Sequence, residues 1–251
     1  METIAPQKDE MIIEIGAGRG ALTFPLLKSA GHLIALEKDP ALILSLKKDE
    51  IANFTILEAD VLKISFEEIC RPHGQYRGRV KIVGSLPYSI SSPLLFKVLE
   101  ARKLFSGCVF LVQKEVAERI TAQPGSKKYA PLSILFQIHF TPKIDLVVRP
   151  SAFSPPPKVD SALVSLIKRD KPLIGIPDEN RFSGFLRVCF ARRRKTLRNN
   201  LAALALSPAR LEDAYQKLGL EPRIRPEQLT ISQFARLFCL LHDSGAATVM
   251  E

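Results

Sequence analysis

Three short apolar runs occupy the first sixty residues, and each is followed within two residues by glycine or an acidic side chain. They span residues 11–15, 32–36 and 54–58, and helical patterns at 21–29 and 39–48 separate them. Short apolar runs bounded by turn residues are typical of buried strands. Strands that alternate with helices predict an α/β fold whose parallel sheet is covered on both faces.

The alternation continues and then stops. Further strands are predicted at 79–83 and 108–112, a strand hairpin at 144–148 and 162–167, and helices at 93–105, 113–121 and 131–140. From residue 180 onward only helical patterns occur, at 182–190, 196–204, 208–218 and 231–242. Residues 171–179 (KPLIGIPDE) are typical of a linker. We therefore predict an α/β domain over residues 1–174 and a small all-helical domain over 175–251.

The composition excludes several classes of protein. A hydrophobic fraction of 46% with 25% charged residues is ordinary for a globular chain of 251 residues and argues against wholesale disorder. No apolar stretch is long enough to predict a transmembrane helix. The first ten residues lack the apolar core of a secretion signal, so we expect a cytoplasmic protein.

The cysteines and histidines do not cluster in the sequence. None of the four cysteines forms a C-x-x-C pair, and the four histidines are widely spaced. These spacings favour neither a metal site nor a disulfide framework. We expect no bound metal.

Positive charge is concentrated in one segment. The chain has 36 basic and 26 acidic residues, a net charge of +10, and residues 181–200 hold seven Arg or Lys with no acid. Such a density favours a polyanionic partner such as nucleic acid. Part of the run could instead pair with acids of a neighbouring helix.

The glycines after the first strand begin a candidate nucleoside site. Gly16, Gly18 and Gly20 follow that strand, Glu37 ends the second, and Asp60 follows the third. Acids at successive carboxyl ends of parallel strands can accept hydrogen bonds from ribose hydroxyls and from an adenine amino group. The G-x-G-x-G spacing lacks the third glycine of the dinucleotide fingerprint, which favours S-adenosylmethionine over NAD.

A tetrapeptide after the fourth strand supplies the predicted chemistry. Ser85, Leu86, Pro87 and Tyr88 follow the glycine and acid series in chain order. Backbone carbonyls of Ser85 and Leu86 could bond both hydrogens of an exocyclic amine, and proline would fix these acceptors in advance. Tyr88 could stack on a flipped-out base.

These residues and several longer stretches resemble one family. The stretches include IIEIGAGRGALTFPLL, VGSLPYSISSPLLFKVLE, RPSAFSPPPKVDSALV and FARRRKTLRNNL, and the resemblance extends from residue 11 to about 240. The chain resembles ribosomal RNA adenine N6,N6-dimethyltransferases of the KsgA type. That resemblance implies a Rossmann-like S-adenosylmethionine-dependent domain with a helical RNA-binding tail. It further implies dimethylation of two adjacent adenines in the 3′-terminal hairpin loop of small-subunit rRNA, within a pre-ribosomal particle and by a monomer.

The resemblance also assigns roles by position. It implies cofactor contacts from Gly16, Gly18, Glu37, Asp60, Val61 and Ser85, and catalytic roles for residues 85–88. Tyr88 and Phe153 would sandwich the target adenine. Arg192, Arg193, Arg194, Lys195 and Arg198 would bind RNA phosphates, with Lys127 and Lys128 adding to the track.

Two departures from the family pattern stand out. Position 85 is Ser where the family has Asn, and the shorter side chain predicts slower transfer or a stop after one methyl group. Family members carry a Q-N-F-L segment before the first strand, whereas the ten residues before Met11 match none of it. From this we expect a truncated chain or an unusually open cofactor pocket.

Two other functions fit parts of the sequence. One is a large-subunit rRNA adenine methyltransferase of the macrolide-resistance type, and the other is an RNA-binding ribosome-assembly factor with weakened catalysis. The basic stretch and the helical tail fit the small-subunit enzyme better than the large-subunit one.

Overall fold

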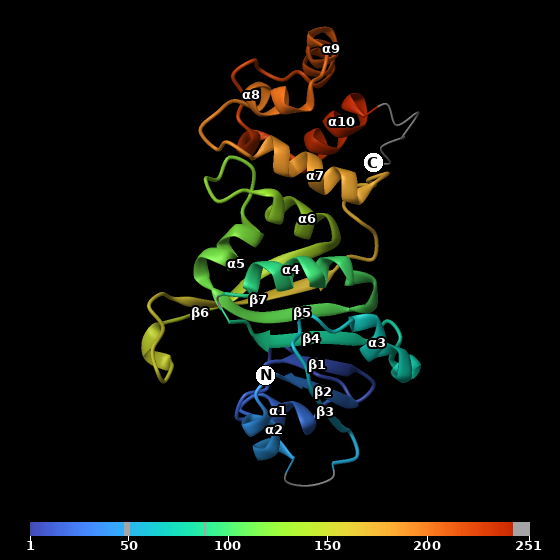
Figure 1. Cartoon of the computed structure of the whole chain (residues 1–251), viewed down its shortest axis with the longest axis vertical. Coiled ribbons are helices and arrows are strands. Elements are labelled where there is room, and N and C mark those ends of the chain that lie inside the picture. Colours follow the sequence, from blue (N-terminus) through green and yellow to red (C-terminus); the bar gives the residue numbers. More distant parts are fainter. Residues whose placement is uncertain (48–50, 88, 243–251) are drawn as a thin grey trace. The chain divides into compact units, whose positions relative to one another are not determined.

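The computed structural model describes residues 1–47, 51–87 and 89–242 (Figure 1). These residues form a seven-stranded sheet in the order β3-β2-β1-β4-β5-β7-β6. Its strands are β1 (Met11–Ile15), β2 (His32–Glu37), β3 (Phe54–Glu58), β4 (Val80–Ser85), β5 (Gly107–Gln113), β6 (Phe140–Val148) and β7 (Ser161–Lys168). The predicted α/β class is confirmed.

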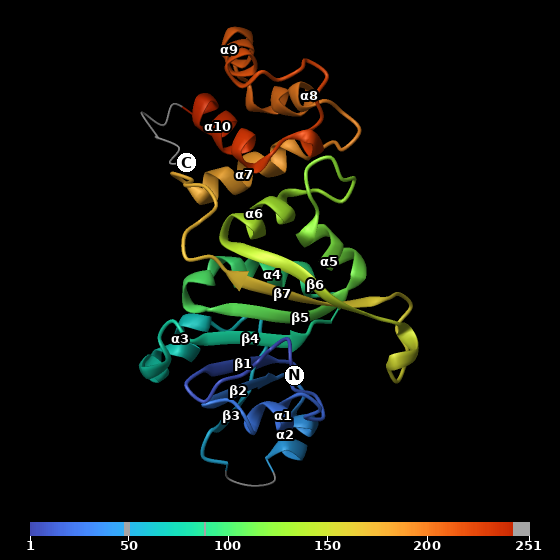
Figure 2. The ribbon, with the colours of Figure 1, turned by 180° about the vertical axis from the view of Figure 1, so that it is seen from behind.

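The prediction of a parallel sheet is wrong at one edge. β1 to β5 pair in parallel, but β7 is antiparallel to both β5 and β6. β6 and β7 form the expected hairpin, because a loop without a crossover helix can join only antiparallel neighbours. That loop extends as an arm beyond the sheet (Figure 2).

Helices precede and follow the strands as the alternation predicts. They are α1 (Thr23–Leu27), α2 (Pro40–Leu46), α3 (Phe66–Cys70), α4 (Ser91–Glu100), α5 (Lys114–Thr121), α6 (Pro131–His139), α7 (Glu179–Cys189), α8 (Leu197–Leu201), α9 (Pro208–Leu218) and α10 (Ile231–Leu241). Short 3-10 turns are η1 (Arg71–Tyr76), η2 (Arg102–Leu104), η3 (Pro150–Ala152), η4 (Ala202–Leu204) and η5 (Pro226–Gln228). The sequence patterns did not predict α3 or η1.

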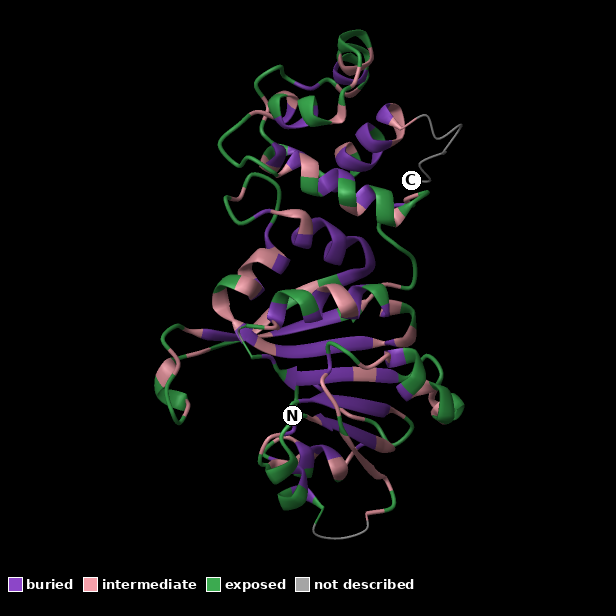
Figure 3. Cartoon of the chain, viewed as in Figure 1, coloured by how far each residue is buried: buried purple, intermediate pink, exposed green. Residues whose placement is uncertain are grey.

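Both faces of the sheet are covered around β1 and β4. On one face Ile4, Leu26 of α1 and the nearby Ala30 pack with side chains of the strands, among them Ile12 and Val83. On the other face lies α4, whose side chains Leu94, Leu95 and Val98 are fully buried (Figures 1 and 2). The central strands are accordingly buried along nearly their whole length (Figure 3).

The chain divides into two compact units. Unit 1 contains Met1–Ala117 and Phe140–Lys168, and unit 2 contains Glu118–His139 and Arg169–Glu251. Within unit 2, the Gln137 side-chain amide donates to the carbonyls of Ile120 and Ala122, at 3.0 and 2.8 Å. The same segment also bonds the chain that leads to the C-terminal helices, because the Leu173 N–H donates to the Ile138 carbonyl at 2.7 Å, although the segment precedes β6. The linear domain division between residues 174 and 175 stays a prediction.

No helix of the described residues is long and apolar enough to cross a bilayer.

Gly84 sets how closely β4 can approach β1. A Cβ atom at this position would lie 2.5 Å from the Ile15 carbonyl oxygen, which cannot move without disturbing the strand. Gly84→Ala is therefore expected to destabilise the protein by about 1–3 kcal/mol, the usual cost of overpacking. Urea unfolding measures the loss.

Gly184→Ala is the matched control. Gly184 is exposed within α7, and an added Cβ there would meet nothing within 4 Å. Alanine should stabilise this helix by up to about 1 kcal/mol. Equal unfolding free energies for the Gly84→Ala and wild-type proteins would contradict the steric argument.

Candidate active site

The carboxyl ends of four parallel strands meet at one edge of unit 1. β1 lies between β2 and β4, with Ile15 opposite both Leu36 and Gly84, and Glu37 lies opposite Glu58 on β3. Strand order reverses between β1 and β4, which is where open α/β sheets bind their ligands. The structure therefore brings the predicted glycines, acids and tetrapeptide to a single edge.

The glycine loop takes a backbone conformation that side chains disfavour. Gly16, Gly18 and Gly20 have φ angles of +71°, +56° and +84°. A Cβ on Gly16 would lie 4.0 Å from the Ser85 carbonyl oxygen, so the loops after β1 and β4 approach each other closely. Because the glycines carry no side chain, this space is left for a ligand.

Glu37 is anchored by three backbone donors. Its Oε2 accepts from the Gly18 N–H at 2.8 Å, and its Oε1 accepts from the N–H groups of Lys38 and Asp39 at 2.7 and 3.0 Å. A carboxylate has about four acceptor positions and three are taken, so one remains for a ribose hydroxyl. The carboxylate is thereby oriented before any ligand arrives.

Asp60 is held ionised at the end of β3. Its Oδ1 accepts from the Leu62 N–H at 3.0 Å, and its Oδ2 lies 3.2 Å from Lys38 Nζ. The Leu62 hydrogen bond, then the Lys38 ammonium, lower the pKa of this carboxyl below its ordinary value. The next residue, Val61, is buried and fixes the turn against the protein.

Hydrogen bonds hold the described residues of the tetrapeptide, residues 85–87, in place. Ser85 is the exposed last residue of β4, and the N–H of the buried Leu86 donates to the Leu111 carbonyl at 2.9 Å. The Pro87 carbonyl accepts from the Ile90 N–H at 3.1 Å and the Ser91 hydroxyl at 2.9 Å. Tyr88 lies outside the described residues. Hydrogen bonds therefore fix the chain before and after residue 88, the position predicted to stack on a base.

Phe153 lies in the loop between β6 and β7. It is half-buried, and its N–H donates to the Pro150 carbonyl at 3.1 Å. Ser161, where β7 begins, pairs with Gln113 at the carboxyl end of β5, so this loop starts at the same edge as the tetrapeptide. A sandwich of Phe153 with Tyr88 stays a prediction.

In unit 2 the basic segment forms an exposed loop between α7 and α8. Arg192, Arg193, Arg194 and Lys195 are all exposed, and Arg193 donates to the Lys127 carbonyl. Lys128, the residue after Lys127, forms an ion pair with Glu118. The loop therefore presents a run of cations to solvent.

Asn200 fixes the base of this loop, and the sequence reasoning missed it. The side chain is buried; its Oδ1 accepts from the Arg192 N–H at 2.9 Å, and its Nδ2 donates to the carbonyls of Arg192 and Thr196 at 3.3 and 3.2 Å. An asparagine can close a loop in this way because it carries a donor and an acceptor together. Its position four residues after Thr196, a helix N-cap, was the available signal.

Arg198 differs from its neighbours because it already has partners. It forms an ion pair with Glu212 and lies 5.3 Å from the Tyr215 ring centroid. These contacts join α8 to α9 and give Arg198 a structural role. Its predicted contact with RNA stays a prediction.

Glu14 is a second residue that the sequence reasoning did not single out. It lies on β1, two residues before Gly16, and only 1% of it is exposed. Its Oε2 accepts from the Thr23 hydroxyl at 2.7 Å. Burial raises the pKa of this carboxyl to about 7, against the lowering effect of the Thr23 hydrogen bond, and the charge of Glu37 raises it further.

The polar groups at this edge suit an adenosyl group better than a metal ion. They consist of glycine backbone, two separated carboxylates and backbone oxygens, which are groups that hydrogen-bond hydroxyls and amines. Among the described residues, no three or more His, Cys, Asp or Glu side chains gather as metal ligands would. That no metal is bound stays a prediction.

Comparison with known proteins decides the family. The family model described as ribosomal RNA adenine dimethylase matches residues 1–243. The chain belongs to the ribosomal RNA adenine dimethylase family. It is an S-adenosylmethionine-dependent methyltransferase, as the resemblance implied.

Individual relatives agree with the family match. Ribosomal RNA small subunit methyltransferase A of Xylella fastidiosa is 41% identical over 239 residues, which cover 94% of this chain and 87% of that protein. Its namesake in Geobacter metallireducens is 40% identical and covers 91% of this chain and 84% of that one.

Solved structures share the fold. A dimethyladenosine transferase from Plasmodium falciparum has a TM-score of 0.75 with 28% identity, and covers 92% of this chain and 90% of its own. The 23S rRNA methyltransferase ErmE has a TM-score of 0.71 with 26% identity, and covers 96% and 94%. The predicted Rossmann-like fold with a helical C-terminal region is confirmed.

The raised pKa of Glu14 predicts a stability that depends on pH. Between the ordinary value of 4.5 and about 7, the folded state keeps the proton while the unfolded chain loses it, so stability falls as pH rises. The loss is complete above about pH 7 and amounts to about 3 kcal/mol. Glu14→Gln, which stays neutral, should lack this loss. Urea unfolding from pH 4 to 8 measures the difference between the two proteins.

Thr23→Val provides the control for this assignment. It removes the hydrogen bond that lowers the Glu14 pKa, so the fall in stability should extend to higher pH. A difference between wild type and Glu14→Gln that stays constant across the range would show that Glu14 ionises normally.

Proposed function

We propose that this chain dimethylates the N6 amino groups of two adjacent adenines in the 3′-terminal hairpin loop of small-subunit rRNA. In this proposal it acts as a monomer, in the cytoplasm, on a pre-ribosomal particle. The observation that carries the proposal is the meeting of glycine loop, acids and tetrapeptide at one edge, in a chain about 40% identical to small-subunit enzymes.

The acids and glycines would hold the cofactor in this reading. Glu37 faces the ribose hydroxyls, Asp60 accepts from the adenine amino group, and Val61 packs on the base. Gly16 and Gly18 leave the space in which the ligand lies. When bound, S-adenosylmethionine supplies an electrophilic methyl group. Because Glu37 is fixed by backbone donors, it loses little freedom on binding.

The tetrapeptide would orient the target amine. The N6 lone pair of adenine is delocalised into the ring, so the amine is a poor nucleophile. Carbonyl oxygens of Ser85 and Leu86 would accept its two hydrogens and favour a pyramidal nitrogen, while Pro87 keeps the acceptors in place. Tyr88 and Phe153 would stack on the extruded base.

The helical part of the chain, residues 175–251, would bind the RNA backbone. Arg192, Arg193, Arg194 and Lys195 are exposed and available to phosphates, whereas Arg198 is engaged with Glu212 and would add less. Phosphate contacts are independent of sequence, so this loop would supply affinity and the tetrapeptide would select the base.

The two alternatives gain no support. The large-subunit enzyme ErmE shares the fold at 26% identity, well below the small-subunit relatives. A catalytically weakened assembly factor would rest on Ser85 and on the unmatched Q-N-F-L segment. The turn after Ser85 keeps its hydrogen bonds, through the Leu86 N–H and the Pro87 carbonyl.

The direct test uses the purified protein, labelled S-adenosylmethionine and immature small subunits. Label mapped to two adjacent adenines of the 3′-terminal loop is the expected result. Label in a large-subunit adenine would support the resistance-type enzyme instead. Cofactor binding without transfer to either subunit would support the assembly factor.

Position 85 provides a sharper test of the chemistry. Ser85→Asn should raise the methylation rate several-fold, because the longer amide brings its oxygen nearer the amine, and Ser85→Ala should lower it. Single-turnover transfer with saturating cofactor measures both. Equal rates for the wild type and both variants would show that the Ser85 side chain does not contribute to catalysis.

A further inference from the structure

A cavity of about 400 Å³ lies at the opposite edge of unit 1, where the parallel strands begin. Its walls come from α3, η1 and η2, and its floor includes Val80, the first residue of β4. The five residue steps from Val80 to Ser85, at about 3.3 Å each, put this edge ~17 Å from the tetrapeptide. The cavity is therefore separate from the candidate active site.

The rim of the cavity carries cations that lack carboxylate partners. Arg71, Arg77 and Lys103 line it and are exposed, and none of them has an ion pair among the described residues. Glu67 is the acid that lines it, and the Ser65 hydroxyl donates to its Oε2 at 3.0 Å. Three cations against one carboxylate leave the rim positive.

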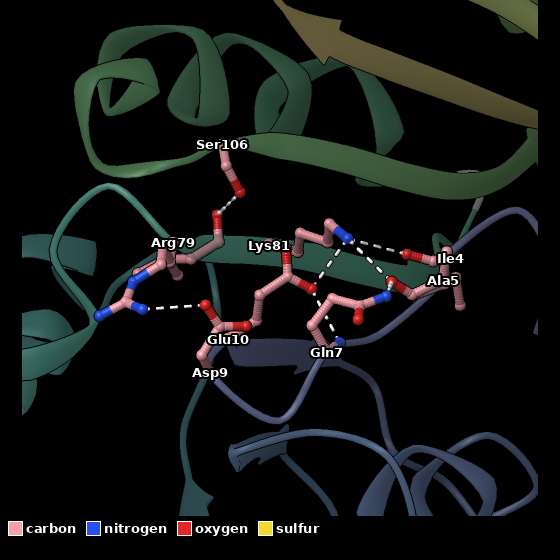
Figure 4. A network of polar contacts seen from close by, with 9 residues as sticks. Ile4, Ala5, Gln7, Asp9, Glu10, Arg79, Lys81 and Ser106 are labelled. Atoms are coloured by element: carbon pink, nitrogen blue, oxygen red, sulfur yellow. Dashed lines mark hydrogen bonds and ion pairs between the residues drawn. The ribbon is translucent and has the colours of Figure 1, made fainter.

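Two other cations close by are neutralised, which sets the rim apart. Figure 4 shows Arg79 bonded to Asp9 at 2.9 Å, and Lys81 bonded to Glu10 at 2.9 Å and to the Ile4 and Ala5 carbonyls. The N-terminal segment thus supplies acids to these two cations. The rim cations face solvent without such compensation.

Aromatic rings continue the same surface. The His73 ring lines the cavity and lies 4.7 Å from the His32 ring, whose centroid is 6.4 Å from that of Tyr76. All three residues are partly exposed. Cations interleaved with exposed rings are the pattern by which proteins bind a nucleic-acid strand.

We propose that this cavity is a second RNA site, which holds backbone phosphates of the substrate rRNA on the side of the sheet away from the target adenine. The proposal rests on the function proposed above. The rim cations are exposed rather than enclosed, which suits a long polyanion passing over the surface better than a small anion that must be desolvated. Burial raises the pKa of the Cys70 thiol to about 11, so this lining residue adds no negative charge.

The test compares two double variants of equal charge. Arg71→Gln/Arg77→Gln removes two rim cations. Lys47→Gln/Lys171→Gln removes two exposed cations that have no described carboxylate partner and lie outside the cavity, the active site and residues 175–251. Dissociation constants for immature small subunits are measured by filter binding across a salt series. The rim variant should bind several-fold more weakly, and its salt slope should fall by about two, one for each lost phosphate contact. The control should keep the wild-type slope.

Other outcomes have defined meanings. Equal changes in both variants, or no change in either, would overturn the proposal. Thermal stabilisation of wild type but not of the rim variant by inorganic pyrophosphate, with RNA affinity unchanged, would assign the cavity to a small anion and also overturn it. Methyl transfer by wild type to the expected adenines keeps the proposed function intact in either case, and its absence would count against that function alone.

Discussion

The close pairing of β1 with β4 is the constraint on which the site depends. Gly84 brings its backbone against the Ile15 carbonyl, and one residue further along each strand Gly16 and Ser85 approach each other. A side chain at Gly84 would push the two strands apart, and one at Gly16 would be strained by its φ of +71°. The cofactor loop and the tetrapeptide are thus held together by the sheet itself rather than by contacts between their side chains.

Sequence patterns predicted most of the helices and strands, because interactions between residues close in sequence determine where these elements begin and end. Asp39 accepts from the Ala41 N–H and begins α2 as its position before Pro40 indicates, and Gly219 ends α9 in a left-handed conformation. The sequence predicts that α4 begins at residue 93, but the helix starts at Ser91 after Ile90, which supplies no side-chain cap. Caps identify a helix end to within a residue or so, since neighbouring polar residues compete for it.

Features that depend on distant residues could not be predicted in the same way. The hairpin of β6 and β7 was predicted, but the antiparallel pairing of β7 with β5 was not, because an apolar run does not show which strand it pairs with. The position of Asn200 after the N-cap Thr196 indicates a helix start, but not that its side chain bonds back to Arg192 across the loop. The predicted site residues at strand ends were easier, because parallel strands carry their carboxyl ends to one edge whatever the loops contain.

The anchoring of Glu37 has a consequence for how this chain can change over time. Its two partners at positions 38 and 39 are peptide N–H groups, so almost any amino acid there preserves them, proline being the exception. Substitutions at these positions can alter charge or size while the acid keeps its orientation. The orientation of Glu37 is therefore independent of those two side chains, although Lys38 also pairs with Asp60 and Asp39 also caps α2.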